Sequence, residues 1–377
     1  MSIFDQLDQQ DFINNFWQQK AVLFTQVFSN IINLVDGNEL AGLACEEGVE
    51  ARIIKGDKID ADWTCHHGPF KADDFKVLGD RDWTLLVQGV DQWDDEISNI
   101  LKQFMFLPSW RLEDIMASYA PTGGSVGPHF DYYDVFLIQI SGSREWQTGQ
   151  LCDNTTALQN NSEVKLLTSF DNQQTYTVNA GDMIYIPAGI AHWGKSLSDN
   201  CVTFSVGFRA PSDKEMIIET LESLIHHFEN TDETNIRFKD TPDSIDHHPN
   251  KLNEAALKQL APVLDNITPE LLTQSINTAF GKLVTDPRYS PFDDEEQKTW
   301  TEKDLTQLFN QNSEIHIGHS TNSRFAFSET HLFVNGEVYD SNESFSQAIC
   351  DKKISKPTSK QQTDILIALL NQQYITI

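Results

Sequence analysis

The sequence has few basic residues. Lys and Arg total 27 against 56 for Asp and Glu, which gives a formal charge of -29 over 377 residues. A surface of that sign repels polyanions and attracts cationic partners. The composition therefore argues against nucleic acid as the primary ligand and favours a basic partner.

Long apolar runs and closely spaced cysteines are also missing. No stretch approaches the roughly 20 apolar residues that a bilayer span needs, and the N-terminal sequence lacks a basic start followed by an apolar run. The five cysteines, Cys45, Cys65, Cys152, Cys201 and Cys350, are scattered along the chain. Such spacing suits free thiols in a reducing compartment. We therefore expect a soluble, cytoplasmic chain that does not contact a membrane.

The apolar content of 39% suffices for a sizeable core, and the length predicts two or three units. The first 85 or so residues mix helix-like and irregular patterns. From Trp83 to Arg209 the chain changes to short β-rich runs. These runs are TLLVQGV, DVFLIQIS, REWQTG, TYTV, MIYIP and VTFSVGF. Many short strands without helices between them predict a barrel or a sandwich.

A helical pattern follows the β-rich region. Ser212 and Glu215 form a capping box ahead of an apolar stripe, and Thr268 followed by Pro269 begins a later helix. Helices at these positions would make residues 211–290 a helical region.

The last part of the chain reads as a third unit. RFAFSETHLFVNGEVYD predicts strands around an Asn335-Gly336 hairpin turn, and DILIALLNQQY predicts a helix. Together they are compatible with a small winged-helix module. We therefore expect a catalytic domain over 1–210 with its β core at about 85–209, the helical region over 211–290, and a winged-helix-like domain over 291–377.

The segment GPHFDYYDVF carries a candidate metal motif. A mononuclear iron that binds a co-substrate and O2 needs three protein ligands on one face, which two histidines and one carboxylate supply. On a strand, His129 and Asp131 would point to the same side, about 6 to 7 Å apart. Both could then hold one ion.

The motif alone is weak, because chance predicts one or two His-x-acid pairs in a chain with 11 histidines. A second pair, His227 and Glu229, is present. It lies near the end of the predicted amphipathic helix, where residues two apart point to nearly opposite sides. That pair cannot chelate well and serves as an internal control.

The third ligand should come from a distant strand, and His192 is the candidate. It lies in GDMIYIPAGIAHWG, in which a Gly-Asp turn, an apolar strand and a proline turn precede the histidine. This order is typical of the second half of a cupin-type metal site. We predict that His129, Asp131 and His192 hold Fe(II).

A 2-oxoglutarate co-substrate would chelate the iron through its 2-oxo acid end, so its far carboxylate needs a cation deeper in the barrel. A guanidinium can hold that carboxylate with two parallel hydrogen bonds. Arg144, which follows the turn at 141–143, is our first choice. Lys195 and Arg209 remain rivals.

Three segments together, GPHFDYYDVFLIQISG, GDMIYIPAGIAHWG and SVGFRAP, resemble the bacterial JmjC-type ribosomal oxygenases, and the resemblance spans nearly the whole chain. It implies an α+β chain with a double-stranded β-helix of the JmjC/cupin type, a helical dimerisation region and a C-terminal winged-helix domain. It also implies an Fe(II)- and 2-oxoglutarate-dependent dioxygenase that uses O2 to hydroxylate C3 of an arginine in ribosomal protein L-sixteen of the large subunit. A homodimer with a basic ribosomal substrate is the expected assembly.

The resemblance also implies roles for single residues. It places the metal triad on His129, Asp131 and His192, and the co-substrate cation on Arg144. It further implies substrate contacts for Asp114 and Met116 on the strand that enters the barrel. Tyr132 or Tyr133 would flank the substrate, of which we take Tyr133. Ser205 on the final strand would touch the co-substrate.

The chain departs from the family pattern at two turns. Glu145 stands where relatives are expected to be more basic, which bears on Arg144 as the sole anchor. Pro187-Ala188-Gly189 replaces the usual Pro-Pro-Gly. Two alternatives remain open: an oxygenase that acts on another protein, and a cupin sensor whose winged helix regulates transcription.

Three further signals carry less weight. Adjacent residues Cys65, His66 and His67 cannot easily converge on a zinc ion. The glycine-rich 123–127 segment lacks the Lys-Ser/Thr of a phosphate loop. Residues 291–377 hold 7 Lys/Arg against 13 Asp/Glu, which disfavours DNA contact by the third unit and favours a protein contact.

Overall fold

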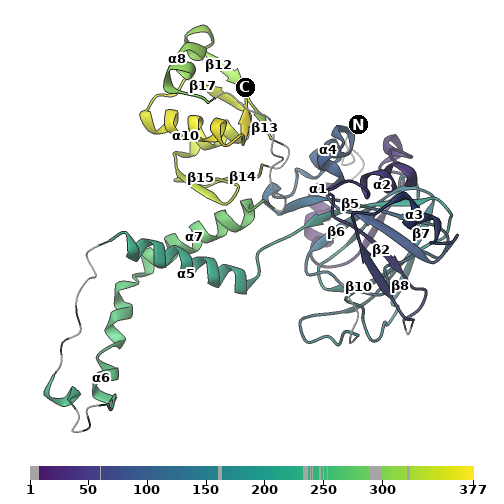
Figure 1. The fold of residues 1–377 in the computed structure, drawn as a ribbon, viewed down its shortest axis with the longest axis horizontal. Coiled ribbons are helices and arrows are strands. Elements are labelled where there is room, and N and C mark those ends of the chain that lie inside the picture. Colours follow the sequence, from purple (N-terminus) through teal and green to yellow (C-terminus); the bar gives the residue numbers. More distant parts are fainter. Residues whose placement is uncertain are drawn as a thin grey trace. The chain divides into compact units, whose positions relative to one another are not determined.

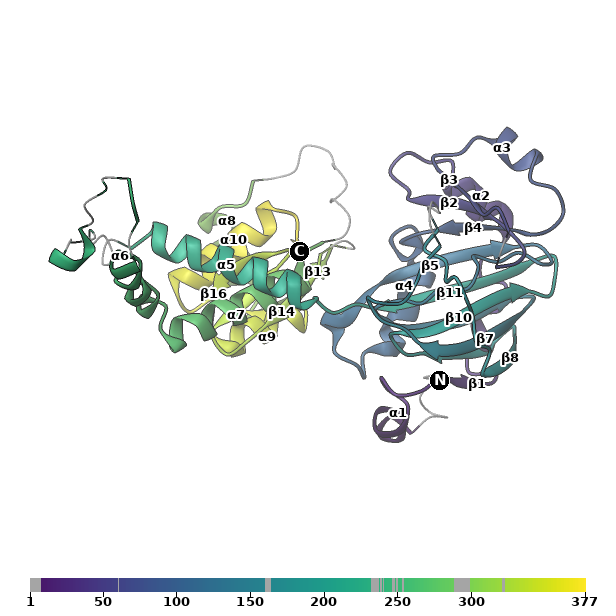
Figure 2. The ribbon, with the colours of Figure 1, turned by 90° about the horizontal axis from the view of Figure 1, so that it is seen from below.

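The computed structural model describes residues 8–59, 61–159, 164–231, 237, 239, 241–245, 248, 250–252, 254–287, 299–320 and 323–377. Its chain separates into two compact units, Met1–Ala210 and Pro211–Ile377. Each unit has its own hydrophobic core. Figures 1 and 2 show the β-rich first unit and the mixed second unit, which are described separately below.

Two antiparallel sheets form the first unit. The larger has the order β1-β9-β6-β11-β5-β4-β2-β3 and the smaller the order β10-β7-β8. Their strands are β1 Val22–Phe24, β2 Ala51–Lys55, β3 Thr64–His67, β4 Trp83–Val87, β5 Leu112–Ala120, β6 Asp134–Ser141, β7 Ser143–Leu151, β8 Gln174–Asn179, β9 Met183–Ile186, β10 Ile190–Ser196 and β11 Cys201–Phe208. All six β-rich runs predicted from the sequence are strands here.

Alternation along the strands gives the large sheet two distinct faces. On β6, Phe136 and Ile138 pack into an outer core, whereas Val135 and Leu137 face inward and contact Trp146 of the smaller sheet. The outer core is closed by helices α1 Gln9–Asn15, α2 Gly37–Leu43 and α4 Asp95–Leu101, which contribute Phe12, Leu40, Ile97 and Ile100. One face of the sheet is thus covered by helices, and the other encloses the barrel interior.

The N-terminal third differs from its prediction. We expected helix-like and irregular structure before about residue 85, but β1, β2 and β3 lie there and extend the large sheet at both of its edges. β2 and β3 pair in register from Arg52 with His67 to Lys55 with Thr64. These short strands carry charged and histidine side chains, so their sequences lack the apolar alternation that marks the central strands.

A buried carboxylate ties the N-terminal segment to the barrel. Asp134, fully buried at the start of β6, accepts a hydrogen bond of 2.5 Å from the Tyr185 hydroxyl. Its other oxygen accepts from Gln18 Nε2 at 3.1 Å and from Arg111 Nη2 at 3.2 Å. Burial, and then the charge of Asp134, raise the pKa of Tyr185 above its ordinary range. The phenol therefore stays protonated and donates to the carboxylate.

Removing that donor should weaken the first unit. In Tyr185→Phe, a buried carboxylate loses one partner, and hydrogen bonds to charged groups contribute about 1.5 to 3 kcal/mol. We expect the free energy of unfolding of this unit to fall by about that amount in denaturant titrations. Tyr132→Phe is the matched control, because that side chain is 68% exposed. Equal stabilities of the two variants would contradict the role assigned to Asp134.

The second unit begins with a pair of long helices, α5 Asp213–Glu229 and α7 Pro269–Thr285. The Ser212 hydroxyl accepts from the backbone N–H of Glu215, and Glu215 returns a bond, as the capping box predicted. Thr268 caps α7, with Pro269 at its first position. Between them lies the short α6 Glu254–Lys258.

The rest of this unit packs around one core. Its elements are α8 Glu302–Gln311, β12 Glu314–His316, β13 Gly318–His319, β14 Phe325–Phe327, β15 His331–Val334, β16 Glu337–Asp340, α9 Glu343–Cys350, β17 Lys353–Ser355, α10 Lys360–Asn371 and β18 Ile375–Thr376. Asn335 and Gly336 have φ of +49° and +78°, so the predicted two-residue hairpin turn joins β15 to β16. The predicted C-terminal helix is α10.

Two further predictions are tested only in part, because they also concern residues outside the described ranges. The boundary at 290/291 lies outside them, so the division of the second unit into a helical region and a winged-helix-like domain stays a prediction. Among the described residues, no helix combines the length and the apolarity that a bilayer crossing requires.

Candidate metal centre

The loop before β6 is held against β10 by its backbone. His129 donates its N–H to the His192 carbonyl at 3.0 Å, and His192 returns the bond at 2.8 Å. Two residues on, the Asp131 carbonyl accepts from the N–H of Gly189 at 2.8 Å. These bonds bring the two halves of the motif together although they lie 63 positions apart in the sequence.

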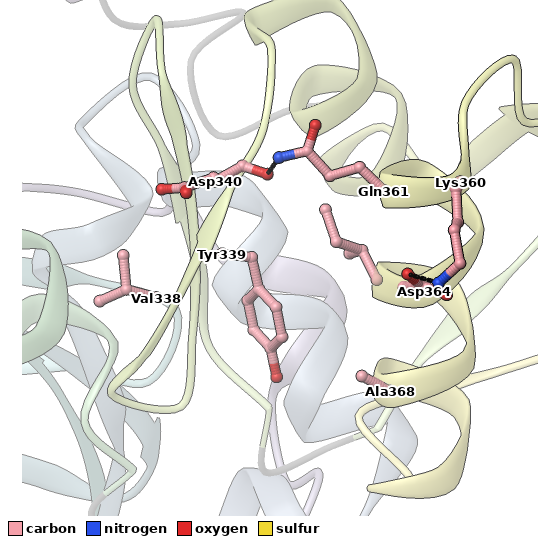
Figure 3. A pocket seen from close by; sticks show the side chains of 8 residues that line it. Val338, Tyr339, Asp340, Lys360, Gln361, Asp364 and Ala368 are labelled. Atoms are coloured by element: carbon pink, nitrogen blue, oxygen red, sulfur yellow. Dashed lines mark hydrogen bonds and ion pairs between the residues drawn. The ribbon is translucent and has the colours of Figure 1, made fainter.

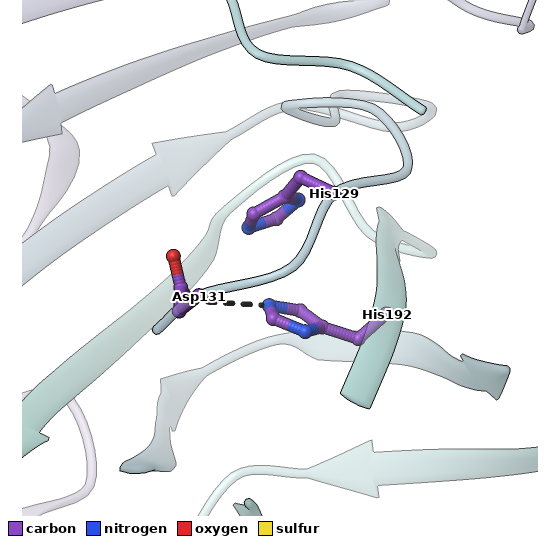
Figure 4. A group of neighbouring side chains, drawn as sticks. All are labelled: His129, Asp131 and His192. Carbon is purple, nitrogen blue, oxygen red and sulfur yellow. Dashed lines mark ion pairs between the residues drawn. The ribbon is translucent and has the colours of Figure 1, made fainter. Parts of the chain in front are cut away.

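Three side chains converge at this crossing, as Figure 4 shows. One ligand atom from each of His129, Asp131 and His192 lies within 4.8 Å of the others, and His192 Nε2 is 3.5 Å from Asp131 Oδ2. His192 is 2% exposed, whereas His129 and Asp131 are half-buried. Three protein donors of this kind suit a metal that must also bind exogenous ligands.

Both imidazoles are oriented by their own backbone. Nδ1 of His129 lies 2.9 Å from the Gly127 carbonyl, and Nδ1 of His192 lies 2.9 Å from the Ile190 carbonyl. A carbonyl can only accept, so each Nδ1 carries the proton and each Nε2 presents a lone pair. Burial, and then the neighbouring His129, lower the pKa of His192 to about 4, against the opposing effect of Asp131. The imidazole is therefore neutral, the form that binds metals.

The expected strand context is wrong in one respect. His129 forms only an isolated β-bridge with His192, and Asp131 lies in the extended segment before β6 begins at Asp134. His192 lies on a strand as expected, but that strand, β10 Ile190–Ser196, is not among the six β-rich runs predicted from the sequence. The control pair, His227 and Glu229, lies on α5 as expected and belongs to no metal-competent cluster among the described residues.

Arg144 lies deeper in the same barrel. It is 2% exposed on β7, and its Nε and Nη2 have no hydrogen-bond partner among the described residues. Its guanidinium lies over the Trp146 ring, 5.5 Å from the centroid. A buried cation with two unused donors is costly unless a ligand supplies an anion. The fit to a small carboxylate is therefore good.

The two rival cations lie elsewhere. Ser196 on β10 pairs with Arg144, and Lys195 is its neighbour in the chain. Because side chains alternate along a strand, Lys195 lies on the face of β10 opposite to Ser196. Arg209 follows β11, its side chain is 55% exposed, and Nη1 is 3.8 Å from Glu113 Oε1. Neither has the burial of Arg144. Glu145, the departure from the family pattern, accepts a hydrogen bond from Gln147 on the half-exposed face of β7, opposite to the buried face that carries Arg144.

Strand register orders the barrel interior. Along β7 and β10 the inward pairs are Arg144 with Ser196, Trp146 with Gly194, and Thr148 with His192. Arg144 is thus four residues from the row of the histidine, a rise of about 13 Å. A Cβ on Gly194 would lie 2.6 Å from the Trp146 ring, so glycine is needed for the indole to fit.

The sequence reasoning missed the residues that surround Arg144. Burial alone would raise the pKa of the Cys201 thiol, but the positive charge of Arg144 and hydrogen bonds from Ser196, Arg144 and Gln139 outweigh it and lower the pKa. Gln139 Nε2 is 3.2 Å from Cys201 Sγ. The alternation of Arg144 and Trp146 within REWQTG could have revealed the indole, whereas nothing near Cys201 or Gln139 in the sequence links them to Arg144.

The residues predicted on the substrate side line the same interior. Asp114 is 4% exposed, and its Oδ2 accepts from Gln88 Nε2 at 2.9 Å. Met116 pairs in register with Ser205, and both are half-buried. A Cβ on Gly207 would lie 3.8 Å from the ring of Tyr133, which places that tyrosine against β11. Tyr132, by contrast, is 68% exposed.

Comparisons with known proteins agree with this geometry. Residues 99–216 match the model of the JmjC domain. The chain is 37% identical over 219 residues to a probable ribosomal oxygenase of Haemophilus influenzae, covering 57% of this chain and 53% of that protein. It is 38% identical over 217 residues to the ribosomal protein uL16 3-hydroxylase of Escherichia coli, covering 56% and 55%. The chain thus matches about half the length of these curated relatives.

Solved structures extend the likeness to almost the whole chain. The E. coli ribosomal oxygenase YcfD aligns with a TM-score of 0.80 at 27% identity over 98% of both chains. Its complex with cobalt and 2-oxoglutarate aligns with a TM-score of 0.77 at 26% identity over the same shares. The first unit therefore has the JmjC cupin fold.

Proposed function

We propose that this chain, which carries a JmjC domain and resembles ribosomal oxygenases, is an Fe(II)- and 2-oxoglutarate-dependent protein hydroxylase. One observation carries the proposal. The convergent donors of His129, Asp131 and His192 share a barrel with the buried guanidinium of Arg144, two of whose nitrogens, Nε and Nη2, have no hydrogen-bond partner among the described residues. A 2-oxo dicarboxylate needs the metal ligands at the end where it chelates the metal. It also needs a cation deeper in the barrel for its far carboxylate.

The chain's own residues would divide the work as follows. His129, Asp131 and His192 hold the metal and leave its remaining positions open. Arg144 binds the far carboxylate of 2-oxoglutarate, and Ser205 contacts the co-substrate from β11. When bound, the iron would let O2 oxidise both substrates: 2-oxoglutarate would lose CO2 and take up one oxygen atom to become succinate, and the other oxygen atom would convert a C–H bond to C–OH.

The substrate that we propose is an arginine of ribosomal protein uL16, hydroxylated at C3. Asp114 supplies a buried carboxylate for the guanidinium, with Met116 and Tyr133 against the substrate chain. The chain's formal charge of -29 would speed encounter with a basic ribosomal protein. The name of the E. coli relative supports the choice, and the chain's acidity agrees with it.

We further propose that the second unit comprises a helical dimerisation region over 211–290 and a winged-helix-like domain over 291–377. On α5 the side chains of Ile217, Leu221 and Ile225 are 60%, 53% and 57% exposed, and they recur at the spacing of one helix face. On α7 Leu272 and Ile276 are also exposed. Contiguous apolar side chains of this kind mark an interaction site.

The activity is tested by intact-mass analysis of ribosomal proteins. We expect the purified chain with Fe(II), 2-oxoglutarate and O2 to add the mass of one oxygen atom to uL16. His129→Ala removes a metal ligand and should abolish the product, whereas the control His227→Ala should leave it intact. Product formation by His129→Ala would overturn the metal assignment. Addition to another protein, with uL16 unchanged, would overturn the substrate assignment alone.

The co-substrate anchor is tested by Arg144→Lys. Lysine keeps the charge but cannot form two parallel hydrogen bonds. We expect KM for 2-oxoglutarate to rise about 10- to 100-fold, the loss that follows from one or two charge-assisted bonds, with a smaller change in kcat. Lys195→Met, on the other face of β10, is the control. A larger effect of Lys195→Met than of Arg144→Lys would reverse the assignment.

The dimer is tested by light scattering. Leu221→Asp places a carboxylate in the exposed apolar face of α5 and should halve the mass measured for the wild-type chain. Glu222→Ala, an exposed polar position on the same helix, should leave the mass unchanged. A wild-type chain that scatters as a monomer would remove the dimer from the proposal.

A further inference from the structure

The second unit has a sheet with an open edge. The order of its three-stranded sheet is β14-β15-β16, so β16 pairs on one side only within the described residues. A two-residue turn joins Val334 to Glu337, so these two residues form a hydrogen-bonded pair. The next pair, Phe333 with Val338, is then a non-hydrogen-bonded pair, because the two kinds of pair alternate along an antiparallel ladder. The backbone groups of Val338 and Asp340 therefore point away from β15.

Helix α10 lies beside that edge and leaves a groove between the two elements, as Figure 3 shows. Gln361 Nε2 donates to the Asp340 carbonyl at 2.8 Å, and the Tyr339 hydroxyl donates to Gln372 Oε1 at 2.7 Å, so the helix is fixed to the strand at two points. The groove has a volume of about 510 Å³, with Tyr339, Ile365 and Ala368 among its lining residues. An exposed strand edge beside a helix is the arrangement to which extended peptides add as a further strand.

The rim of the groove is acidic. Asp340 and Asp364 line it, and their side chains are 82% and 55% exposed. Glu337 is exposed at the start of β16. Among the described residues, Lys360, paired with Asp364 at 2.8 Å, is the one Lys or Arg that lines it. His331 Nε2 lies 3.5 Å from Asp340 and adds charge only when protonated. The carboxylates outnumber the ammonium group, so the edge favours a basic strand and disfavours nucleic acid.

Natural edge strands are protected by lysine, proline, bulges or a covering element. β16 reads Glu-Val-Tyr-Asp and has neither lysine nor proline, and its register with β15 is unbroken. α10 is fixed beside it but leaves the outward groups of Val338 beside an open groove. Within the described part of the chain, this edge therefore lacks the lysine, proline and bulge that usually protect an edge strand.

We propose that the groove between β16 and α10 binds an extended, basic segment of a partner protein, which adds as a strand to β16. Alternate side chains of the segment would lie on Tyr339, Ile365 and Ala368, and its lysine or arginine side chains would meet Asp340 and the exposed Asp364 at the rim. The groove shares no residue with the metal centre, so the proposed peptide binding can be tested separately from the hydroxylase activity.

The probe is a fluorescein-labelled hexapeptide of alternating lysine and valine, titrated with the full-length chain and followed by fluorescence anisotropy. We expect saturable binding. The double variant Asp340→Lys/Asp364→Lys should weaken it at least tenfold, whereas Asp351→Lys, a charge reversal after α9 and outside the groove, should change it little. A serine-valine hexapeptide should bind at least tenfold more weakly. His129→Ala should bind like the wild type.

Strand addition also requires free backbone N–H groups on the peptide, which gives a second, independent test. The same hexapeptide with alternate amides N-methylated cannot pair with an edge, and should lose binding although its charge is unchanged. Hydrogen exchange should show new protection of the Val338 amide on binding. Absence of binding to the wild type, equal binding of the N-methylated peptide, or equal binding by Asp340→Lys/Asp364→Lys would each overturn the proposal. Preference for a DNA duplex over the peptide would also overturn it.

Discussion

The reciprocal backbone hydrogen bonds between His129 and His192 are the constraint on which the site depends. They are two bonds of an irregular bridge, yet they fix the separation of the imidazoles without help from any ligand. The ring nitrogens are then set by bonds to the carbonyls of Gly127 and Ile190. A centre that is organised in this way needs little rearrangement to accept an ion, so little of the binding energy is spent on ordering the chain.

The side chains that line the barrel interior change from apolar to polar with depth. Val135, Leu137 and Ile184 make part of it apolar, and Trp146 packs against them. Beyond the indole lie Arg144, Cys201 and Gln139, which are all buried. Low polarity strengthens any interaction that the guanidinium makes and raises the cost of leaving it unpaired. The Cys201 side chain, which hydrogen-bonds with Arg144, is the neighbour that offsets part of that cost.

Much of this could be predicted from the sequence, because the central strands and the long helices carry strong local signals. Val202, Phe204 and Val206 alternate with smaller residues, and Ser212 marks its helix through a short-range cap. The three candidate ligands were likewise predicted from turn and strand context, and the structure brings their side chains together. Where local signal was weak, prediction failed. β10 contains Gly194 and Lys195, β2 begins and ends near charged side chains and β3 carries two histidines, so pairing with neighbours rather than composition makes them strands. Asp134 accepts hydrogen bonds from Tyr185 and Gln18. These residues are so far apart in the sequence that no local sequence pattern could reveal the contact.

The register of β7 has a consequence for which small molecules the barrel accepts. One strand carries both Arg144 and Thr148, and Thr148 pairs directly with His192. A β-strand in a closed barrel cannot stretch, because its rise per residue is fixed by covalent geometry. The distance between the guanidinium and the two candidate metal-binding histidines is therefore fixed by the strand. Under the proposed function, a dicarboxylate one carbon shorter or longer than 2-oxoglutarate could satisfy one end of the site or the other, but not both at once.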